Sequence, residues 1–403
     1  MSTSVLYHGF GVRDYKYLKT EYCQGEVIFH VEKDPPKIRC AECKSNNVIK
    51  FGRVERRVRT VPIGQRRVWL VLHLHRLQCR DCSGIALEPV LLAFARKHWT
   101  KHLGRYILEL LKHATVQDVA EHLDMSWDTV KEIHAWALTQ QFRRRRIQHL
   151  EYLGVDEIAV KKGHKYLTLV VDLQSGEVVW VAEAREMASL EPFLRRLKQA
   201  KAPIKAIAMD MWPAYIGAVL RYYPSEVIVF DRYHVISDYN KVLDELRRQE
   251  AAAAPEVYQG AYVGVRYLLL KGQERIQDRP EAKAKLDRLL ALNQTLNTAY
   301  ILKEELRDLW NCPTRQDATD YLCDWLKKAE ASGIHLLQKF AKTLAAHRSG
   351  ILNYFDHPIT TAKVEGINNK IKVLKRQAYG FRDMAYFKLR IYFLHQSTYA
   401  LVG

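Results

Sequence analysis

Residues 152–160 read Tyr-Leu-Gly-Val-Asp-Glu-Ile-Ala-Val, an apolar run that carries two adjacent acids. The β-branched and aromatic residues in this run predict a β-strand. Because successive side chains of a strand point to opposite faces, Asp156 and Glu157 are expected to face different ways. Only one of the two can then join a site shared with other acids, and the segments that follow favour Asp156.

Four further strands are predicted after the first one. They are expected at residues 166–172, 178–182, 204–209 and 227–230. A helix with apolar residues at helical spacing separates the third strand from the fourth, and another helix begins at Pro213. The fourth strand ends on Asp210 and the fifth on Asp231. The order βββαβαβα is that of the ribonuclease-H-like fold, an α/β fold in which acids at strand ends meet around metal ions.

A long helical interval separates these strands from the last acidic stretch. Residues 239–357 predict an all-helical insertion that interrupts the α/β core. Residues 361–376 then read Thr-Ala-Lys-Val-Glu-Gly-Ile-Asn-Asn-Lys-Ile-Lys-Val-Leu-Lys-Arg. In a helix, residues three and four apart are neighbours. One face of this helix is therefore expected to carry Glu365, Asn368 or Asn369, Lys372 and Arg376.

A single acid within a basic stripe fits a helix whose acid binds a metal ion and whose bases hold phosphates. The alternative is an ion-paired surface helix. Three carboxylates, on Asp156, Asp210 and Glu365, can hold two divalent cations about 3.5–4 Å apart. An oxygen-rich site with open positions favours Mg²⁺ or Mn²⁺. The basic residues of this helix that we expect to contact DNA are Lys370, Lys372, Lys375 and Arg376.

Asp231 and His234 form an Asp-x-x-His pattern directly after the fifth strand. We interpret them either as auxiliary residues of the acidic site or as a helix cap and a buried histidine. Asp172 precedes a turn, where aspartate is common. If Glu365 is not the third acid, the remaining candidates are Glu157, Asp172 and Asp231.

Two Cys-x-x-Cys pairs, Cys40 with Cys43 and Cys79 with Cys82, lie within residues 36–90. Four thiolates in two such pairs complete the tetrahedron of a structural Zn²⁺ site. The segment between the pairs alternates in hydrophobicity, so the sequence predicts a zinc ribbon with a long β-insert. Four unrelated cysteines are the alternative. The basic residues expected to contact the DNA backbone here are Arg53, Arg56, Arg57, Arg59, Arg66 and Arg67.

Residues 115–133 predict two short helices joined by a turn, with Thr115 and Ser126 as the N-caps. Such a pair, within residues 91–147, resembles a helix-turn-helix, although an ordinary helical hairpin has the same pattern. The start of the second helix and the arginine run that follows it are expected to contact DNA. The residues concerned are Trp127, Thr129, Lys131, Arg143, Arg144, Arg145 and Arg146.

The charge of the chain favours a polyanionic partner. Its 403 residues include 63 Lys and Arg against 45 Asp and Glu, a net charge of +18, which is typical of proteins that bind nucleic acid. The N-terminus lacks a signal-peptide pattern, and no apolar run reaches the ~20 residues of a membrane span. An odd count of seven cysteines favours reduced thiols or metal ligands over disulfides.

Taken together, the motifs resemble a bacterial insertion-sequence transposase of the ISL-three family, a DDE type. The motifs are the two cysteine pairs, the helix-turn-helix, Gly154-Val-Asp-Glu, Met209-Asp-Met-Trp-Pro-Ala-Tyr, Phe230-Asp-Arg-Tyr-His-Val, Val364-Glu-Gly-Ile-Asn-Asn-Lys-Ile-Lys and Tyr379-Gly-Phe-Arg. They follow the family's order and cover nearly the whole chain. The resemblance implies that Asp156, Asp210 and Glu365 are the catalytic acids. It also implies that the protein cuts the ends of its own element and joins the freed 3′ hydroxyls to target DNA.

Six segments are expected along the chain. They are a leader at 1–35, the zinc ribbon at 36–90, the helix-turn-helix domain at 91–147, the first part of the catalytic core at 148–238, the helical insertion at 239–357, and the last part of the core at 358–403. The expected partner is double-stranded DNA, both terminal inverted repeats and target. A homodimer or higher oligomer is expected because two ends must be held together. The protein is expected in the bacterial cytoplasm, associated with the nucleoid and not with a membrane.

Two other functions fit part of the pattern. A transposase-derived DNA-binding regulator predicts a broken acid set, whereas Asp156, Asp210 and Glu365 are all present. A structure-selective nuclease of the same fold does not need both a zinc ribbon and a helix-turn-helix. Inverted repeats in the DNA that flanks the gene would favour the transposase.

Overall fold

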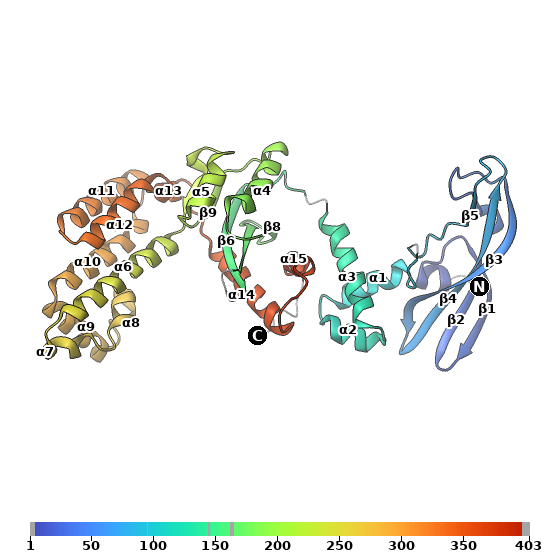
Figure 1. Ribbon diagram of the computed structural model, residues 1–403, viewed down its shortest axis with the longest axis horizontal. Coiled ribbons are helices and arrows are strands. Elements are labelled where there is room, and N and C mark those ends of the chain that lie inside the picture. Colours follow the sequence, from blue (N-terminus) through green and yellow to red (C-terminus); the bar gives the residue numbers. More distant parts are fainter. Residues whose placement is uncertain (1–4, 95, 144–145, 162–164, 397–403) are drawn as a thin grey trace. The chain divides into compact units, whose positions relative to one another are not determined.

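The computed structural model describes residues 5–94, 96–143, 146–161 and 165–396 (Figure 1). The chain forms two compact units. The first, here called the terminal unit, combines Met1–Arg144 with Arg382–Gly403, and the second, the central unit, is Arg145–Phe381. The central unit is therefore inserted in sequence between two parts of the terminal unit. Within the described ranges, no helix is both long enough and apolar enough to span a bilayer.

The terminal unit begins with a sheet in the strand order β1-β2-β4-β3, to which β5 is added by pairing with β4. The strands are β1 (Tyr15–Cys23), β2 (Glu26–Lys33), β3 (Val48–Ile63), β4 (Arg66–Cys79) and β5 (Ile85–Leu87). The β2–β4 pairing is parallel and the other pairings are antiparallel. Gln24 and Gly25 make the tight turn between β1 and β2 with φ of 47° and 79°, a conformation that glycine adopts at little cost.

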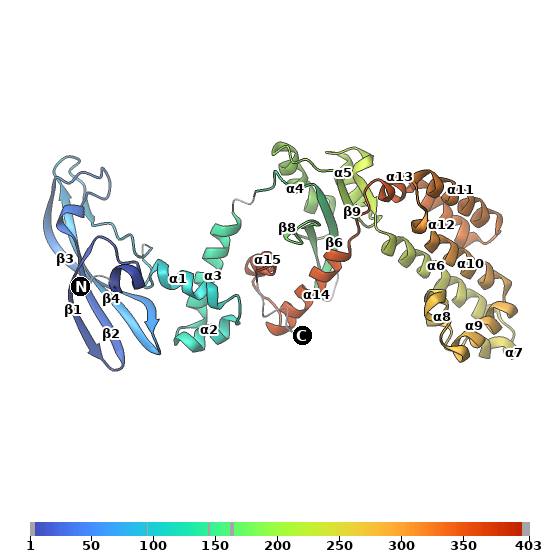
Figure 2. The same ribbon diagram turned by 180° about the vertical axis from the view of Figure 1, so that it is seen from behind.

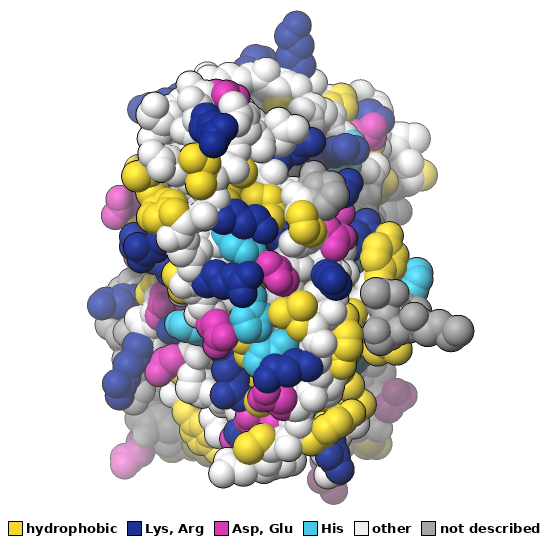
Figure 3. Space-filling view, turned by 90° about the vertical axis from the view of Figure 1, so that its right-hand side faces the viewer, with side chains coloured by type: hydrophobic (Ala, Val, Ile, Leu, Met, Phe, Trp, Pro, Cys, Tyr) yellow, Lys and Arg dark blue, Asp and Glu magenta, His cyan; other side chains and the backbone are white. Residues whose placement is uncertain are grey.

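The predicted alternation along β4 is confirmed. Its core-facing residues are fully buried: Val68, Leu70, Leu72 and Leu74. Because neighbouring positions face the other side, His73 and His75 of β4 lie on the opposite face of the sheet together with His30 of β2. His30 Nδ1 lies 3.1 Å from His73 Nε2. Figure 3 shows histidine side chains gathered among acidic and basic ones on this side of the chain.

The interpretation of residues 1–35 as a separate leader is wrong. The second half of this segment forms β1 and β2, and β2 pairs with β4 along Val27–Glu32 against Val68–His73. Strand β1 mixes Lys, Thr and Glu with Tyr and Leu, as expected for a partly exposed edge strand, so its hydrophobic signal is weak. The sheet thus contains strands that precede the first cysteine pair in sequence and strands that follow it.

Three helices follow the sheet: α1 (Lys101–Leu110), α2 (Val116–Leu123) and α3 (Trp127–Phe142). Thr115 and Asp118 form a capping box at the start of α2, and the Ser126 side chain caps α3, as the sequence predicts. The helices share the predicted core of Val119, Ala120, Leu123, Val130 and Ile133, all of which are buried.

The last helix, α15 (Met384–Phe393), belongs to the terminal unit and packs against α3. The hydroxyl of Tyr386 lies 2.9 Å from Nδ1 of the buried His134, and Lys131 forms a 3.0 Å ion pair with Asp383. The segment 358–403, which was expected to be one part of the core, is therefore divided between the two units. Its residues up to Phe381 belong to the central unit, and those from Arg382 belong to the terminal unit. An amphipathic pattern identifies α15 as a helix but not the partner that it packs against.

The central unit contains a five-stranded sheet in the order β10-β9-β6-β7-β8. The strands are β6 (Tyr152–Lys161), β7 (Lys165–Asp172), β8 (Val178–Glu183), β9 (Ala206–Met209) and β10 (Ile228–Phe230). The strands β6, β7 and β8 pair antiparallel, whereas β9 and β10 run parallel to β6. All five predicted strands are present, and the ribonuclease-H-like order is confirmed.

Helices cover both faces of this sheet (Figure 2). The helices α4 (Met187–Gln199) and α5 (Pro213–Leu220) share a core with the β6 residues Leu153 and Val155. On the other face, α14 (Ala362–Gln377) packs against β6 at Gly154. A Cβ atom on Gly154 would lie 2.6 Å from Val364 Cγ2, so only glycine allows this close approach.

A helical region connects β10 to α14 and confirms the predicted insertion as a helical element. Its helices are α6 (Arg232–Ala253), α7 (Glu256–Gln259), α8 (Arg266–Leu270), α9 (Pro280–Leu292), α10 (Gln294–Asp308), α11 (Arg315–Ala331), α12 (His335–Ala346) and α13 (Arg348–Leu352). The rings of Tyr239, Trp325 and Phe340 pack edge-on at its centre. Asn353 donates its amide to Ile228 O at 2.8 Å, which fixes the region to β10.

Candidate active site

Two of the predicted acids lie side by side on adjacent parallel strands. Asp156 is in β6, and Asp210 directly follows β9. Gly154 pairs with Ala208, so the two aspartates stand at matching positions two residues further along. The carboxyl ends of parallel strands meet at one edge of a sheet, and this edge brings residues 54 positions apart in sequence together.

Asp156 is half-buried, and both of its carboxylate oxygens accept hydrogen bonds. The Glu157 N–H donates to Oδ1 at 2.8 Å, and the Asn368 side-chain amide donates to Oδ2 at 2.8 Å. Burial raises the pKa of Asp156, and the nearby charges of Asp210 and Asp231 raise it further. Grouped negative charges disfavour ionisation unless a cation offsets them. The donor chemistry of this edge therefore fits a divalent cation bound by oxygen ligands.

Asp210 is partly exposed and lies next to the first turn of α6. Its Oδ1 accepts the Met211 N–H at 2.6 Å, and its Oδ2 lies 3.8 Å from His234 Nδ1. His234 is therefore not a buried core histidine, since about a quarter of its side chain is exposed beside the acid.

Glu365 lies in the first turn of α14 and is exposed. With Asp156 it lines a cavity of about 800 Å³, and Asn368 and Lys372 line the same cavity from the same helix. Among the described residues, only the four paired cysteines bring three or more metal-binding side chains within 4.8 Å of one another. Asp156 thus neighbours Asp210 at the strand ends and shares the cavity with Glu365, but the three acids do not converge on a single point.

The helical insertion forms another wall of this cavity. The sequence did not predict that residues of the insertion would lie at the site. It contributes Arg275, Arg307 and Trp310, while Arg232 of α6 lines the cavity from the core side. Arg307 is engaged by Glu274 at 2.6 Å and Glu304 at 3.2 Å. Helical periodicity predicts which face of each helix is buried. It does not show which part of a long insertion lies beside the acids.

The other acids lie where their patterns predict. Glu157 faces the α4 and α5 side of the sheet, where Arg185 pairs with it at 3.1 Å, and burial raises the pKa of Glu157. The Arg185 guanidinium also lies 3.9 Å from the centre of the Trp212 ring. Asp172 accepts the N–H groups of Gln174 and Ser175 in the turn after β7. Glu157 and Asp172 therefore have structural partners of their own.

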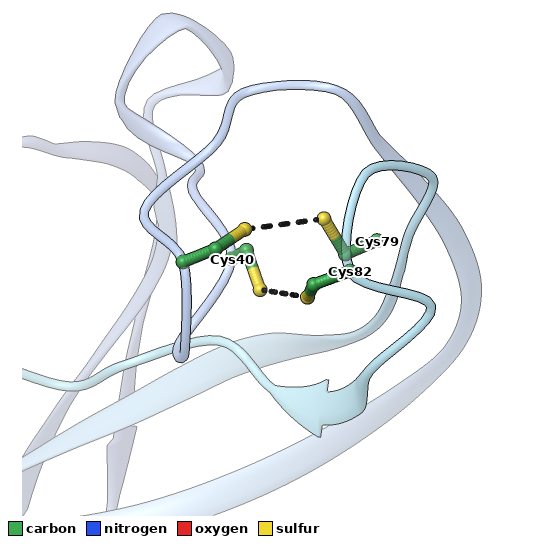
Figure 4. Close-up of side chains that lie close together, drawn as sticks. Cys40, Cys79 and Cys82 are labelled. Atoms are coloured by element: carbon green, nitrogen blue, oxygen red, sulfur yellow. Dashed lines mark hydrogen bonds between the residues drawn. The ribbon is translucent and has the colours of Figure 1, made fainter.

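The four predicted zinc ligands come together at one end of the first sheet (Figure 4). The Sγ atoms of Cys40 and Cys82 are 3.7 Å apart, and those of Cys43 and Cys79 are 3.5 Å apart. A tetrahedral site with Zn–S bonds of about 2.3 Å has sulfur atoms about 3.8 Å apart. Backbone N–H groups of Cys43 and Glu42 lower the pKa of the Cys40 thiol to about 7. The cluster therefore fits one structural zinc ion.

Several arginines that were expected to contact DNA hold the terminal unit together. Arg56 donates to the carbonyls of Phe94 and Lys97 at 2.6 Å, and Arg59 is buried and donates to the carbonyls of Leu123 and Asp124. In both cases the guanidinium fastens β3 to the segment that carries the helices. Arginine patterns alone cannot separate this internal role from DNA contact.

Two more of these arginines are ion-paired. Arg57 pairs with Glu26 at 2.5 Å, and Arg67 pairs with Asp124 at 2.7 Å. Arg53 and Arg66 are exposed on β3 and at the start of β4. Arg57 and Arg67 are exposed as well but are held by their ion pairs, so Arg53 and Arg66 are the DNA-contact candidates of the ribbon.

The expected recognition helix is α3. Trp127 is exposed at its start, and Thr129 shares a hydrogen bond of 2.7 Å with Ser126 at the cap. Lys131 is held by Asp383 and lies 5.3 Å from the Trp127 ring centre. Arg143 and Arg146 are exposed, whereas Arg144 and Arg145 lie outside the described residues.

On α14 the expected basic residues follow the acidic turn. Lys372 and Arg376 are exposed, and Lys370 and Lys375 are partly exposed. The first turn of α14 carries Glu365 and its last turn carries Lys375 and Arg376, as the helix dipole favours. The predicted face with one acid and several bases is therefore present.

Comparison with known proteins gives one consistent family. A family model for an ISL3-type transposase, described as "Transposase", matches residues 153–391. Two more models match residues 36–82, "zinc-finger of transposase IS204/IS1001/IS1096/IS1165", and residues 96–133, "Helix-turn-helix domain of transposase family ISL3".

Individual relatives carry similar descriptions. The chain is 36% identical over 356 residues to the transposase for insertion sequence element IS1001 of Bordetella parapertussis, with 87% of each chain covered. It is 30% identical over 291 residues to the transposase for element IS1557 of Mycobacterium tuberculosis, covering 66% of this chain and 65% of the relative. Among solved structures, the Drosophila P element transposase strand transfer complex matches with a TM-score of 0.41 and 13% identity, covering 74% of this chain and 92% of the other. A transposase model matches more than half of the chain, and a relative is 36% identical over 87% of both chains, so the chain belongs to the ISL3 family of insertion-sequence transposases.

Proposed function

We propose that this transposase cuts the ends of its own insertion sequence and joins them to target DNA through the carboxylates of Asp156, Asp210 and Glu365. The observation that carries the proposal is the grouping of these acids. Asp156 and Asp210 stand side by side on parallel strands, and Glu365 lines the same cavity as Asp156. Four basic side chains line the cavity beside its acids, namely Arg232, Arg275, Arg307 and Lys372, and their positive charge favours a phosphodiester backbone.

The residues around the cavity have different proposed roles. The three acids would hold two Mg²⁺ or Mn²⁺ ions, which when bound make a water or DNA hydroxyl more acidic and neutralise charge on the scissile phosphate. Lys372 and Arg376 of α14 and Arg232 of α6 would hold phosphates of the strand that enters the cavity. His234 lies 3.8 Å from Asp210 and would bind the same strand or share its charge.

Recognition of the element ends is assigned to the terminal unit. The zinc ribbon and the helix-turn-helix would bind the terminal inverted repeats, with the start of α3 in the major groove. Arg53, Arg66, Arg143 and Arg146 are exposed and would contact the backbone. Since one reaction must join two ends, we infer that at least two copies of the chain act together on DNA.

The test is cleavage of a labelled terminal-repeat duplex with Mg²⁺ or Mn²⁺. Replacing Glu365 by Gln keeps the shape of the side chain but removes a negative charge, so cleavage is expected to fall by orders of magnitude while end binding is retained. Asp156→Asn and Asp210→Asn should behave alike, and combining them should add little, because residues that act as a unit are not additive.

The matched control is Glu281→Gln, which changes an exposed acid in the first turn of α9. This variant should cut like the wild type. Normal cleavage by Glu365→Gln would show that the third acid is assigned wrongly, and loss of activity in the control would show that the assay reports general damage.

A further inference from the structure

Asp231 occupies a buried position between the second and third acids. It directly follows β10, and its N–H donates to the carbonyl of Met209 at 3.1 Å, one residue before Asp210. Only 3% of its surface is exposed. The backbone of Asp231 is therefore fixed to the strand end that carries the second acid.

The side chain of Asp231 is also fully engaged. Its Oδ1 accepts the Tyr233 N–H at 2.7 Å, and its Oδ2 accepts the Thr361 hydroxyl at 2.6 Å and the Thr361 N–H at 2.5 Å. Three donors surround one carboxylate, which satisfies both oxygens without a metal ion. This arrangement distinguishes Asp231 from Asp210, whose Oδ2 has only the 3.8 Å contact to His234.

Thr361 lies directly before α14, the helix that carries Glu365. The Glu365 N–H donates to the Thr361 carbonyl at 3.0 Å, so the two residues share the first turn. The same helix is held further along by the Lys363 ammonium on the carbonyls of Leu173 and Gln174 and by Asn368 on Asp156. The Asp231–Thr361 contact is the link that joins the start of α14 to the edge with Asp210.

We propose that Asp231 and Thr361 are positioning residues that set the separation between Asp210 and Glu365 and thereby the geometry of the cation site. The proposal rests on the proposed function, because it assumes that these two acids hold the cations. Asp231 acts through Thr361 rather than as a ligand. Substituting a residue that orients a metal ligand typically costs about 10- to 100-fold in metal affinity.

The test compares full-length Thr361→Val with Thr361→Ser. Valine has the shape of threonine but lacks the hydroxyl that donates to Asp231, whereas serine keeps a hydroxyl, and both retain the backbone N–H that donates to the same carboxylate. Binding of Mn²⁺ to the DNA-free protein is measured by calorimetry, together with end binding and the melting temperature. Thr361→Val should need about 10- to 100-fold more Mn²⁺ for half-saturation. Thr361→Ser should stay near the wild type, and both variants should bind ends normally.

Two further variants complete the design. Thr343→Val is the control, because the Thr343 hydroxyl contacts only the Lys339 carbonyl within the exposed surface of α12. Asp231→Ala removes the same contact from the other side, so adding Thr361→Val to it should weaken Mn²⁺ binding no further. If Thr361→Val does not fold, this pair is replaced by Thr361→Ala with Thr361→Ser as the rescue.

Wild-type Mn²⁺ affinity in Thr361→Val would overturn the role of the Thr361 hydroxyl, and wild-type affinity in Asp231→Ala would overturn the positioning role of both residues. Equal losses in Thr361→Val and Thr361→Ser would also overturn it. Failure of the proposed function is recognised separately, because Glu365→Gln would then cut DNA normally whatever the Thr361 variants do.

Discussion

The side-chain amide of Asn368 donates to Oδ2 of Asp156 at 2.8 Å, across the interface between α14 and β6. Asn368 lies one helical turn after Glu365, so a single helix carries the third acid and a direct partner of the first. The sequence left Asn368 and Asn369 as alternatives for this face. The structure selects Asn368, which is buried, whereas Asn369 is exposed.

Asn368→Ala should therefore lower cleavage and Mn²⁺ affinity by about 10- to 100-fold, since Asp156 loses the group that orients it. Asn369→Ala is the matched control, because its side chain reaches only Lys372, at 3.4 Å. The measurement is the cleavage rate across a Mn²⁺ titration. Equal effects of the two substitutions would mean that the amide does not position Asp156.

The zinc site gives a prediction that is independent of catalysis. Elemental analysis should find one zinc ion per chain, and replacing Cys79 and Cys82 by Ser should remove it, because two thiolates cannot hold the tetrahedron. Cys23→Ser should retain zinc, since Cys23 is an exposed cysteine outside the cluster. A fully folded protein without zinc would contradict the prediction.

Much of the central unit follows from local sequence. The strand that contains Asp156 and the strand that ends before Asp210 are short, mainly apolar runs, and their parallel pairing brings the two acids together. The helix around Glu365 is predictable because its face follows from residue spacing alone. The two cysteine pairs likewise fix a local geometry that needs no knowledge of the rest of the chain.

The remaining features depend on contacts between distant segments. The bond from Asp231 to Thr361 spans 130 positions, and that from His134 to Tyr386 spans 252. Neither hydrogen bond leaves a periodic pattern in the sequence. A single polar side chain can form such a bond, or lack it, without any difference in the residues around it. For the same reason the sequence cannot show that Arg59 is buried against the Leu123 carbonyl rather than exposed to DNA.

The basic residues in the lining of the cavity lead to a prediction about the salt dependence of DNA binding. Arg275 of the insertion and Lys372 of α14 are exposed and line the same cavity. Replacing either by Ala should weaken engagement of the cleaved strand and reduce the salt dependence of binding by about one unit of slope. Lys283→Ala changes an exposed lysine of α9 that does not line the cavity and should leave both unchanged. Unaltered salt slopes for Arg275→Ala would exclude the insertion from the DNA path.

The buried His134 makes the stability of the terminal unit sensitive to pH. Burial holds its pKa well below the usual value, and the charge of Arg390 lowers it further. Below a pH of about 6.5 the unfolded chain binds a proton at this histidine that the folded chain excludes. The free energy of unfolding should therefore fall as the pH drops from 7.5 to 5, by up to about 1.4 kcal/mol per pH unit from this group.

His134→Gln removes the titrating group but keeps a hydrogen-bonding side chain beside Tyr386. Its unfolding free energy should depend less steeply on pH than that of the wild type, whereas His122→Gln, at an exposed position of α2, should follow the wild type. Denaturant unfolding at several pH values makes the comparison. Parallel curves for His134→Gln and the wild type would contradict the assignment.

The final prediction concerns the segment that recognises the element ends. The sequence indicates that the first 140 or so residues suffice, but α15 packs on α3 through Tyr386, and Phe387 is almost fully buried. Phe387→Ala should destabilise the terminal unit by about 3–5 kcal/mol because it removes a buried ring of α15 and leaves a cavity. A fragment of residues 1–143 should therefore bind terminal-repeat DNA more weakly than the same fragment joined to residues 382–396 by a flexible linker. A mobility-shift titration against scrambled DNA of equal length measures the difference. If residues 1–143 alone bind the repeats as tightly as the joined fragment, α15 is dispensable for recognition.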